Sequence, residues 1–388
     1  MERNYILFDT PARELLYPFT HTRPIAACRV GILTIQEKWE HWLGAAVSHF
    51  TVQHLQEKFP LRNGEENTMN ILLSGHILPD ANIVAAVKAM QPDQELYKDN
   101  QLIAKSLQGR EVHLLATGDR KNYTKAIACI QMPWDIFQLN DKAIRDDFAL
   151  LTQGRESAPI PATNQVVNRD QVFIEPGATV ECSLLNAASG PVYIGKNAIV
   201  MEGCLIRGPL ALCEGAVLKM GAKIYGATTL GPFCTGGGEI KNSVMFGYSN
   251  KGHDGYLGDA VIGEWCNLGA NTSCSNVKNN GGNVKVWLEA RGEAAIAGFK
   301  NGVLMGDYSR CGINTMLNTG TVIGVSCNIF GAHFPPVFVP SFSWGGDATY
   351  RLPEALRDAA AWMKMKNKQL DMADSRILEA VYAFTKRP

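Results

Sequence analysis

The stretch VYIGKNAIVMEGCLIRGPLALCEGAVLKMGAKIYGATTL (192–230) carries an aliphatic residue at every sixth position. The aliphatic series is Ile194, Val200, Ile206, Leu212, Leu218, Ile224 and Leu230. Mostly small residues stand two positions before each of these, and three positions after them come Asn197, Gly203, Pro209, Gly215 and Gly221. A second run repeats the spacing with Met305, Cys311, Leu317, Ile323 and Ile329.

A period of six indicates short strands that each turn one aliphatic side chain inward and then bend. Three such hexapeptides close one triangular coil of a parallel β-helix. Successive coils stack at the ordinary strand spacing of about 4.8 Å, so that backbone hydrogen bonds run between coils and no coil is stable alone. The repeat therefore predicts a prism that needs a cap at its ends.

The preceding residues 1–151 have a different pattern of apolar residues. Short apolar runs at 5–8, 70–75 and 111–117 are typical of buried strands, and 81–90 has the pattern of an amphipathic helix. Strands that alternate with helices predict a layered α/β domain.

A polar segment, TQGRESAPIPATNQVVNRD (152–170), separates this region from the hexapeptide repeat and is expected to be an exposed linker. The β-helix is then predicted over 171–346. A helical pattern at 353–385 predicts a C-terminal helical segment over 347–388, which could cover an end or a side of the prism.

The composition excludes several classes of function. The 388 residues contain 37 Lys and Arg against 37 Asp and Glu, so no overall charge draws the chain to nucleic acid or to a membrane surface. No apolar run is long enough for a membrane helix, and the N-terminus lacks the features of a signal peptide. We expect a cytoplasmic protein whose ten cysteines, none in a CxxC pair, are small buried side chains.

Between the two hexapeptide runs lies GHDGYLGDAVIGEWCNLGANTSCSN (252–276). This segment resembles the acetyltransferase domain of the bifunctional N-acetylglucosamine-1-phosphate uridyltransferase (GlmU) family, without a gap. A shorter bacterial variant of that family is similar over nearly the whole chain, through TRPIAACRVGILTIQEKW (22–39), PWDIF (133–137), CGINTMLNTGTVIG (311–324) and PSFSWGG (340–346). The resemblance implies a left-handed β-helix and a homotrimer with acyl-CoA sites between neighbouring prisms.

The resemblance also implies roles for individual residues. His253 matches the base that removes a proton from an amino sugar, a task that a neutral imidazole suits near pH 7. Tyr256, Asn267 and Asn276 match positions that hold the sugar and orient the base. The alternatives are a histidine bonded within a glycine-rich turn, a packed aromatic ring and turn asparagines.

A sugar phosphate requires positive charge, which a neutral protein supplies from a few side chains. Lys223 and Lys241 match the phosphate-binding cations of the family, although an arginine is usual at position 223. Lys285 is a weaker match, because the loop that precedes it differs in length. A solvated surface position is the alternative for each lysine.

The N-terminal domain resembles sugar-1-phosphate nucleotidyltransferases through LYPFTHTRP (16–24). It also departs from them. TPARE (10–14) replaces the glycine-rich loop that cradles a triphosphate, Ile25 replaces a lysine, and Gly75-His76 replaces a Gly-Asp metal site.

Positive side chains could take the place of the missing glycines at the nucleotide. The candidates are Arg13, Arg23, Arg29 and Lys38, and salt bridges at the surface or between domains are the alternative role. Uridylyl transfer would also use Mg²⁺, for which spacing singles out no ligand among Asp9, Asp80 and Asp135.

Three functions follow from these observations. The first is a two-step enzyme that acetylates glucosamine 1-phosphate with acetyl-CoA and couples the product to UTP, giving UDP-N-acetylglucosamine. The second is an acyltransferase whose N-terminal domain binds sugar nucleotide without turnover. The third is a non-catalytic β-helix scaffold, against which the intact His253 segment argues. Small molecules, and neither nucleic acid nor membrane, are the expected partners.

Overall fold

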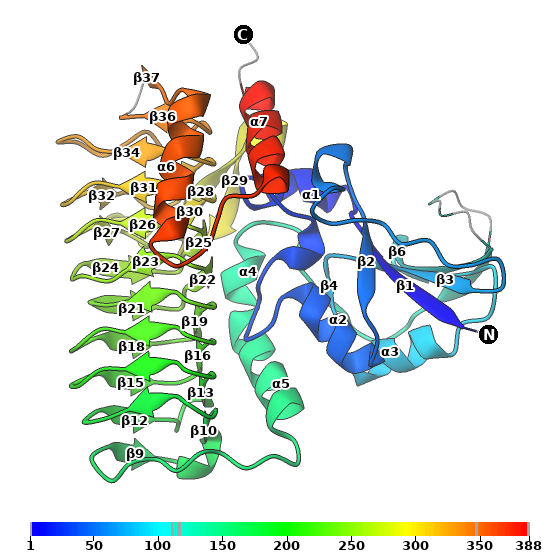
Figure 1. Ribbon diagram of the computed structural model, residues 1–388, viewed down its shortest axis with the longest axis horizontal. Coiled ribbons are helices and arrows are strands. Elements are labelled where there is room, and N and C mark those ends of the chain that lie inside the picture. The colour runs from blue at the N-terminus through cyan, green and yellow to red at the C-terminus, as the bar shows by residue number, and fades with distance from the viewer. Residues whose placement is uncertain (1, 110–111, 113, 115–117, 346–347, 386–388) are drawn as a thin grey trace.

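The computed structural model describes residues 2–385, except 110–111, 113, 115–117 and 346–347. An α/β domain and a long prism of short strands lie side by side, and two C-terminal helices lie at one end of the molecule (Figure 1). None of the helices in the described part of the chain has the length and apolarity to cross a bilayer.

The N-terminal domain contains a six-stranded sheet in the order β2-β1-β3-β6-β5-β7. Its strands are β1 (Arg3–Phe8), β2 (Val47–Phe50), β3 (Met69–Ser74), β5 (Gln94–Lys98), β6 (Gln101–Gln108) and β7 (Asp119–Asn122), and a separate pair consists of β4 (Ile77–Leu78) and β8 (Ala128–Cys129). The strands predicted at 5–8 and 70–75 are confirmed as parts of β1 and β3. The strand predicted at 111–117 lies mostly outside the described residues.

Helices pack against this sheet and connect it to the prism. They are α1 (Ala12–Leu15), α2 (Ile35–Leu43), α3 (Ala81–Lys88), α4 (Asp135–Gln138) and α5 (Asn140–Thr152). Thr34 and Glu37 form a capping box at the start of α2, and Gly44 ends that helix at φ 69°, in the left-handed region that glycine adopts without strain. The helix predicted at 81–90 is confirmed as α3.

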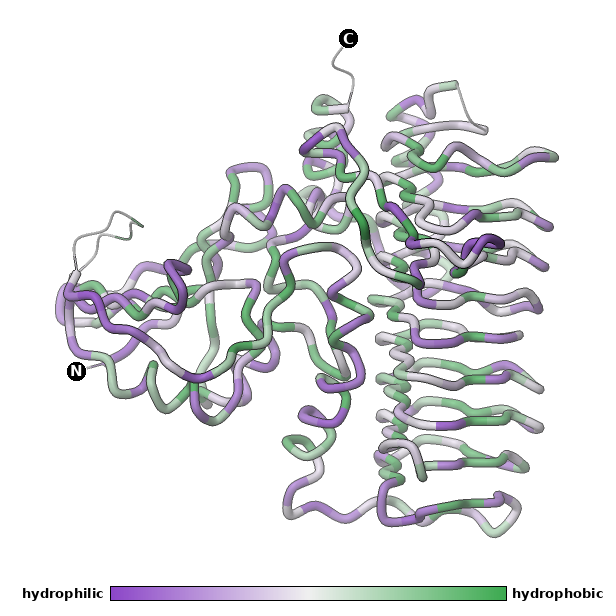
Figure 2. Tube along the Cα trace, turned by 180° about the vertical axis from the view of Figure 1, so that it is seen from behind, coloured by the Kyte–Doolittle hydropathy of each residue, from purple (hydrophilic) through white to green (hydrophobic). Residues whose placement is uncertain are grey.

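The prism is a left-handed β-helix with three faces, each a mainly parallel sheet. The first sheet contains β10 (Val172–Ile174), β13 (Val192–Ile194), β16 (Leu210–Leu212), β19 (Thr228–Leu230), β22 (Val244–Gly247), β25 (Val261–Glu264), β30 (Leu304–Met305), β33 (Val322–Ile323) and β35 (Phe338–Val339). Figure 2 shows hydrophobic segments recurring along this stack of coils.

The second sheet contains β11 (Thr179–Val180), β14 (Ile199–Val200), β17 (Val217–Leu218), β20 (Thr235–Gly236), β23 (Asn250–Lys251), β26 (Asn267–Leu268), β31 (Arg310–Cys311), β34 (Asn328–Ile329), β36 (Ser343–Trp344) and β37 (Ala348–Thr349). The third face contains β9 (Gln165–Val167), β12 (Leu184–Asn186), β15 (Leu205–Arg207), β18 (Lys223–Tyr225), β21 (Glu239–Lys241) and β24 (Tyr256–Gly258), which we call the third sheet, and the pair β27 (Ser273–Cys274) and β32 (Met316–Leu317). Residues 165–167 of the expected linker thus form a strand, because Val166 packs against the core of the prism.

The sixfold aliphatic series fills the interior of the prism. All seven residues of the first run and all five of the second run belong to one buried cluster. The β-helix prediction is therefore confirmed down to the side chains that point inward.

The first sheet is covered on its outer surface by the N-terminal domain. Ile144 and Phe148 of α5 pack with Phe173 and Tyr193 of the prism. As a result, strands of the first sheet such as 192–194 are buried at every position, whereas strands of the third sheet alternate between exposed and buried residues.

A hairpin of β28 (Val284–Leu288) and β29 (Glu293–Gly298) leaves the β-helix between β27 and β30. Val286, Leu288 and Ala297 of this hairpin belong to the hydrophobic core of the N-terminal domain. The hairpin therefore completes the core of the N-terminal domain, while the interior of the prism is a separate buried cluster.

The C-terminal segment forms two helices, α6 (Leu352–Lys364) and α7 (Met372–Thr385). Asn367, at φ 55°, lies in the turn between them. Asp374 of α7 pairs with Lys58 of the N-terminal domain at 2.5 Å, and the guanidinium of Arg310 lies over the Trp362 ring of α6. The helix pair thus joins both domains.

Candidate functional site

The third sheet presents a ladder of polar side chains. Lys223 is paired in register with Glu239, and Glu239 with Tyr256, on the consecutive strands β18, β21 and β24. In the second outward row Tyr225 stands beside Lys241. The two phosphate-binding candidates therefore lie on adjacent strands as diagonal neighbours, about 7–8 Å apart at the backbone.

Glu239 and Tyr225 were not predicted as site residues. The Tyr225 hydroxyl donates a hydrogen bond to Glu239 Oε1 at 2.5 Å. This bond and burial raise the pKa of Tyr225 to about 12. A period of two along a strand could have revealed both residues, since Glu239 precedes Lys241 by two positions and Tyr225 follows Lys223 by two.

Tyr256 belongs to a buried amide and carboxylate network. Asn276 Nδ2 donates to Tyr256 Oη at 3.0 Å and also bonds Asp259, whose other oxygen accepts from Asn242 Nδ2 at 2.7 Å. Burial and the charge of Asp259 raise the pKa of Tyr256, which keeps its hydroxyl protonated. The structure thus brings Tyr256 and Asn276 together, while their role in holding a sugar stays a prediction.

His253 lies at the corner between β23 of the second sheet and β24 of the third sheet, and its side chain is exposed. The corner leads directly into Tyr256 of β24, so His253 lies next to the edge strand of the third sheet. This is an accessible position for a base.

Asn267 and Lys285 lie on other parts of the fold. Asn267 is on β26 of the second sheet, in register with Asn250 and Arg310. Lys285 is an exposed residue of the β28–β29 hairpin. Neither shares the third sheet with Lys223 and Lys241.

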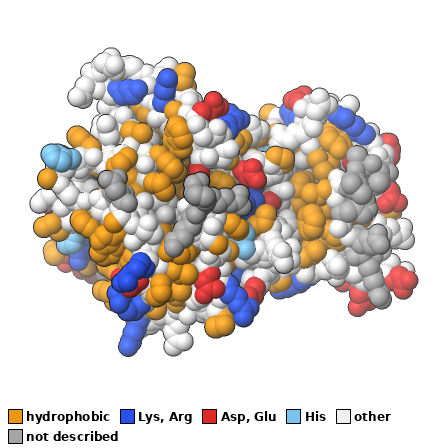
Figure 3. Space-filling view, turned by 90° about the horizontal axis from the view of Figure 1, so that it is seen from above, with side chains coloured by type: hydrophobic (Ala, Val, Ile, Leu, Met, Phe, Trp, Pro, Cys, Tyr) orange, Lys and Arg blue, Asp and Glu red, His pale blue; other side chains and the backbone are white. Residues whose placement is uncertain are grey.

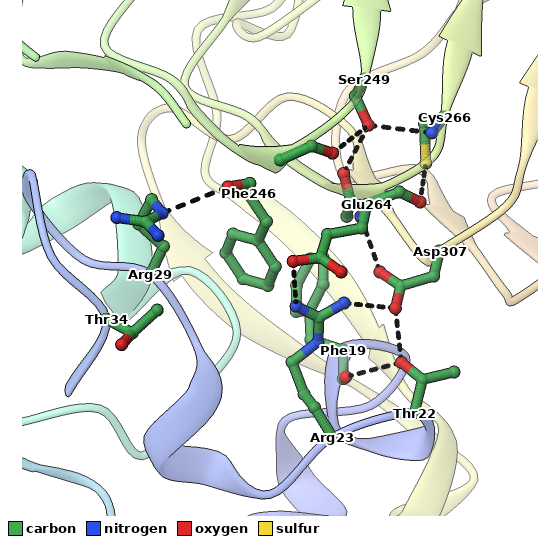
Figure 4. A network of polar contacts seen from close by, with 12 residues as sticks. Phe19, Thr22, Arg23, Arg29, Thr34, Phe246, Ser249, Glu264, Cys266 and Asp307 are labelled. Atoms are coloured by element: carbon green, nitrogen blue, oxygen red, sulfur yellow. Dashed lines mark hydrogen bonds and ion pairs between the residues drawn. The ribbon is translucent and has the colours of Figure 1, made fainter. Parts of the chain in front are cut away.

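Arg23 makes an ion pair across the domain interface. Its guanidinium is 3.2 Å from Glu264 Oε1 and also bonds Asp307, which accepts a hydrogen bond from Thr22 at 2.5 Å (Figure 4). Arg23 is 5% exposed and Asp307 is 2% exposed. The Phe246 ring lies 5.0 Å from the guanidinium carbon.

The other three cationic candidates are also buried and paired. Arg13 Nη2 donates to the Thr20 carbonyl at 2.6 Å, and Arg29 Nε donates to the Phe246 carbonyl at 3.2 Å. Lys38 bonds both carboxylate oxygens of Asp147. Burial lowers the pKa of Lys38 and raises that of Asp147. These contacts match the salt-bridge alternative, while the nucleotide role of the four residues stays a prediction.

Arg23 and Arg29 nevertheless line one cavity of about 420 Å³ between the domains. Lys58, Glu264 and Asp374 also line it, so carboxylates face the same space as the cations. A second cavity, of about 530 Å³, lies where β1 ends, and its lining is uncharged. The lining consists of Phe8, Thr10, Pro11, Ala12, Leu15, His76, Asn100, Gln101, Leu102 and Gln131.

The carboxylates considered for Mg²⁺ do not form a prepared site. Asp9 accepts hydrogen bonds from the Ile25 amide at 2.8 Å and from Thr51, Asp80 caps α3, and Asp135 accepts from the amides of residues 131–132. The described residues include no group of three or more His, Cys, Asp or Glu side chains suited to a metal. These residues do not fit a resident Mg²⁺ ion.

Residues 5–156 match the family described as sugar nucleotidyl transferase. A protein of Methanocaldococcus jannaschii named bifunctional protein GlmU is 30% identical over 195 residues, which are 50% of this chain and 41% of that protein. A bifunctional sugar-1-phosphate nucleotidylyltransferase/acetyltransferase of Sulfurisphaera tokodaii is 34% identical over 93 residues, covering 24% of this chain and 23% of that one. The matches thus span less than half of these relatives.

Among solved structures, the polysialic acid-specific acetyltransferase NeuO aligns with a TM-score of 0.23 and 11% identity. The alignment covers 52% of this chain and 94% of that one.

Proposed function

We propose that this chain is a cytoplasmic transferase of sugar-nucleotide biosynthesis, because residues 5–156 match the sugar nucleotidyl transferase family and half of the chain is 30% identical to a protein named bifunctional protein GlmU. Its central reaction is acetyl transfer from acetyl-CoA to glucosamine 1-phosphate on the third sheet. The observation that carries this proposal is the ladder of Lys223, Lys241 and Tyr256 beside the exposed His253 corner.

The proposed step transfers one acetyl group and removes two protons from the sugar nitrogen, the first to His253 and the second to the departing thiolate. His253 takes a proton from the sugar ammonium group, and the freed amine attacks the thioester carbon. The new C–N bond forms as the C–S bond breaks. Coenzyme A leaves as a thiolate and takes up a proton, so the products are N-acetylglucosamine 1-phosphate and free coenzyme A.

The remaining residues hold the sugar phosphate. Lys223 and Lys241 supply the positive charge that a phosphate requires. Tyr256 and Asn276 hold the sugar through their shared hydrogen bond. Asn267 and Lys285 lie on other faces of the molecule, so in this proposal they would contact the substrate bound by a neighbouring subunit of the homotrimer.

We expect Lys241→Ala to weaken binding of glucosamine 1-phosphate by about 1.5–3 kcal/mol, the value of a charged hydrogen bond. The turnover number should change little, because Lys241 does not touch the reacting nitrogen in this mechanism. Steady-state kinetics measures both effects. Lys196→Ala, at an exposed turn of an earlier coil, is the control and should leave KM unchanged. An unchanged KM in Lys241→Ala would remove this lysine from the site.

The active unit is proposed to be a homotrimer. Large apolar side chains are exposed along the prism, including Leu205, Met220, Ile313 and Met316. The face drawn in Figure 3 carries several separate patches of hydrophobic side chains among polar and charged ones. We expect sedimentation to give three times the mass of one chain at micromolar concentration, and a stable monomer would refute this assembly.

Uridylyl transfer from UTP to N-acetylglucosamine 1-phosphate is the second proposed activity. Its support is that Arg23 and Arg29 line the same interdomain cavity, where guanidinium groups could grip phosphate oxygens. Added Mg²⁺ would neutralise the phosphate charge of bound UTP. Arg13 and Lys38 would complete the cationic set of this proposal.

Mass spectrometry of products from glucosamine 1-phosphate, acetyl-CoA, UTP and Mg²⁺ tests both activities at once, because each step leaves its own mass. Acetylation without pyrophosphate release would favour a nucleotide domain that binds without turnover. The contacts of the four cationic candidates favour that alternative, because each one already binds a carboxylate or a carbonyl group of the protein. The four are Arg13, Arg23, Arg29 and Lys38. No product of either kind would indicate a scaffold.

A further inference from the structure

The corner that carries His253 rests directly on two consecutive glycines, Gly237 and Gly238, of the coil before it. A Cβ atom at Gly237 would lie 2.6 Å from the Gly252 carbonyl oxygen. A Cβ atom at Gly238, whose φ is 65°, would lie 2.7 Å from the His253 carbonyl oxygen. Any side chain at these two positions would therefore push the His253 corner away.

A buried lysine bridges the same two corners. Lys251 is 1% exposed, and its Nζ donates hydrogen bonds to the Gly237 carbonyl at 3.2 Å and to the His253 carbonyl at 2.5 Å. Asp254 is the nearby charge that favours the ammonium form, and burial lowers the pKa of Lys251 to about 8.

Lysine is an unusual residue at this place in a β-helix. Lys251 occupies an inward position of the second sheet, and the inward residues of neighbouring coils in that sheet are Val200, Leu218, Gly236, Leu268, Cys311 and Ile329. An apolar side chain there would avoid the desolvation of an ammonium group. The lysine is therefore better explained by the two carbonyl groups that it ties together than by the packing of the core.

We propose that Lys251, Gly237 and Gly238 are positioning elements that hold the His253 backbone, and with it the imidazole, at the edge of the third sheet. This inference rests on the proposed acetyl transfer. Misplacing a catalytic group by about 1 Å can lower the rate about 10²-fold. Loss of these positioning elements should therefore lower kcat and leave the KM for the sugar phosphate unchanged.

The first test replaces Lys251 with methionine, which has a similar length and no charge. We expect kcat for acetylation of glucosamine 1-phosphate to fall about 10- to 100-fold with KM unchanged. The melting temperature should not fall, because a buried charge is removed. Leu218→Met changes the same inward position two coils earlier and should keep the wild-type kcat.

The second test replaces Gly238 with alanine. Its matched control is Gly221→Ala, at the corresponding corner of the preceding coil, because Gly221 has a similar φ of 69° and open space around its Cβ position. Both variants carry the same backbone strain, but only Gly238→Ala collides with the His253 corner. We expect kcat to fall in Gly238→Ala alone.

Hydrogen–deuterium exchange of the peptide 250–258 gives a readout that does not depend on activity. The proposal predicts faster exchange in Lys251→Met than in the wild type and in Leu218→Met. Unchanged exchange or a wild-type kcat in folded Lys251→Met would overturn the positioning role. If the wild type itself does not acetylate the sugar, the proposed function fails, and the exchange rates still decide whether Lys251 holds the corner.

Discussion

Replacement of His253 by alanine is expected to lower kcat for acetyl transfer by about 10²- to 10⁴-fold, the usual contribution of a general base. Folding should be unaffected, because the side chain is exposed at a corner and fills no inward position of the prism. The KM for glucosamine 1-phosphate should stay nearly constant, because the proposed mechanism assigns phosphate binding to the lysines of the third sheet. Steady-state kinetics with circular dichroism as a folding check measures these quantities.

A suitable control is His333→Ala, which removes another exposed imidazole from a loop between β34 and β35. This variant should retain the wild-type kcat. A folded His253→Ala protein with full turnover would falsify the assignment of this histidine as the base.

The second large effect is expected at Arg23, as a loss of stability. Arg23→Met should lower the free energy of unfolding by about 3–5 kcal/mol, because it leaves the buried carboxylate of Asp307 without its counter-ion. Lys142→Met removes a surface pair in which both side chains are 57% exposed, and it should change stability by about 0.5 kcal/mol or less. Denaturant unfolding curves of both variants provide the comparison.

A double-mutant cycle separates the ion pair from other effects. Asp307→Asn combined with Arg23→Met should cost less than the sum of the single changes, because no isolated charge remains buried. Strict additivity would show that the two groups do not interact. In that case Arg23 would be free to serve a nucleotide instead.

The β-helix was predictable because its signal is local. A hexapeptide repeat requires an aliphatic residue at each inward position. The inward positions of Ile194 and Leu212 can therefore be recognised from the local sequence, without knowledge of distant residues. Lys223 and Lys241 were found through the resemblance, and their register partners Glu239 and Tyr225 follow the same period of two along the strands.

The partners of the N-terminal cations could not be predicted in the same way. Arg23 meets Glu264 and Asp307, which lie more than 240 positions later in the sequence. An arginine that binds phosphate and one that binds a buried carboxylate look alike in a sequence. Only the packing of the first sheet against the N-terminal domain distinguishes the two roles.

The hairpin of β28 and β29 also constrains how this protein is made. Because its apolar residues complete the core of the N-terminal domain, that domain cannot finish folding until the ribosome has translated the chain to Gly298. Nascent chains that stop near residue 156 would expose unfilled apolar surface and be prone to aggregate. Folding of the N-terminal domain therefore depends on synthesis of the β-helix, through the segment that follows Asn276.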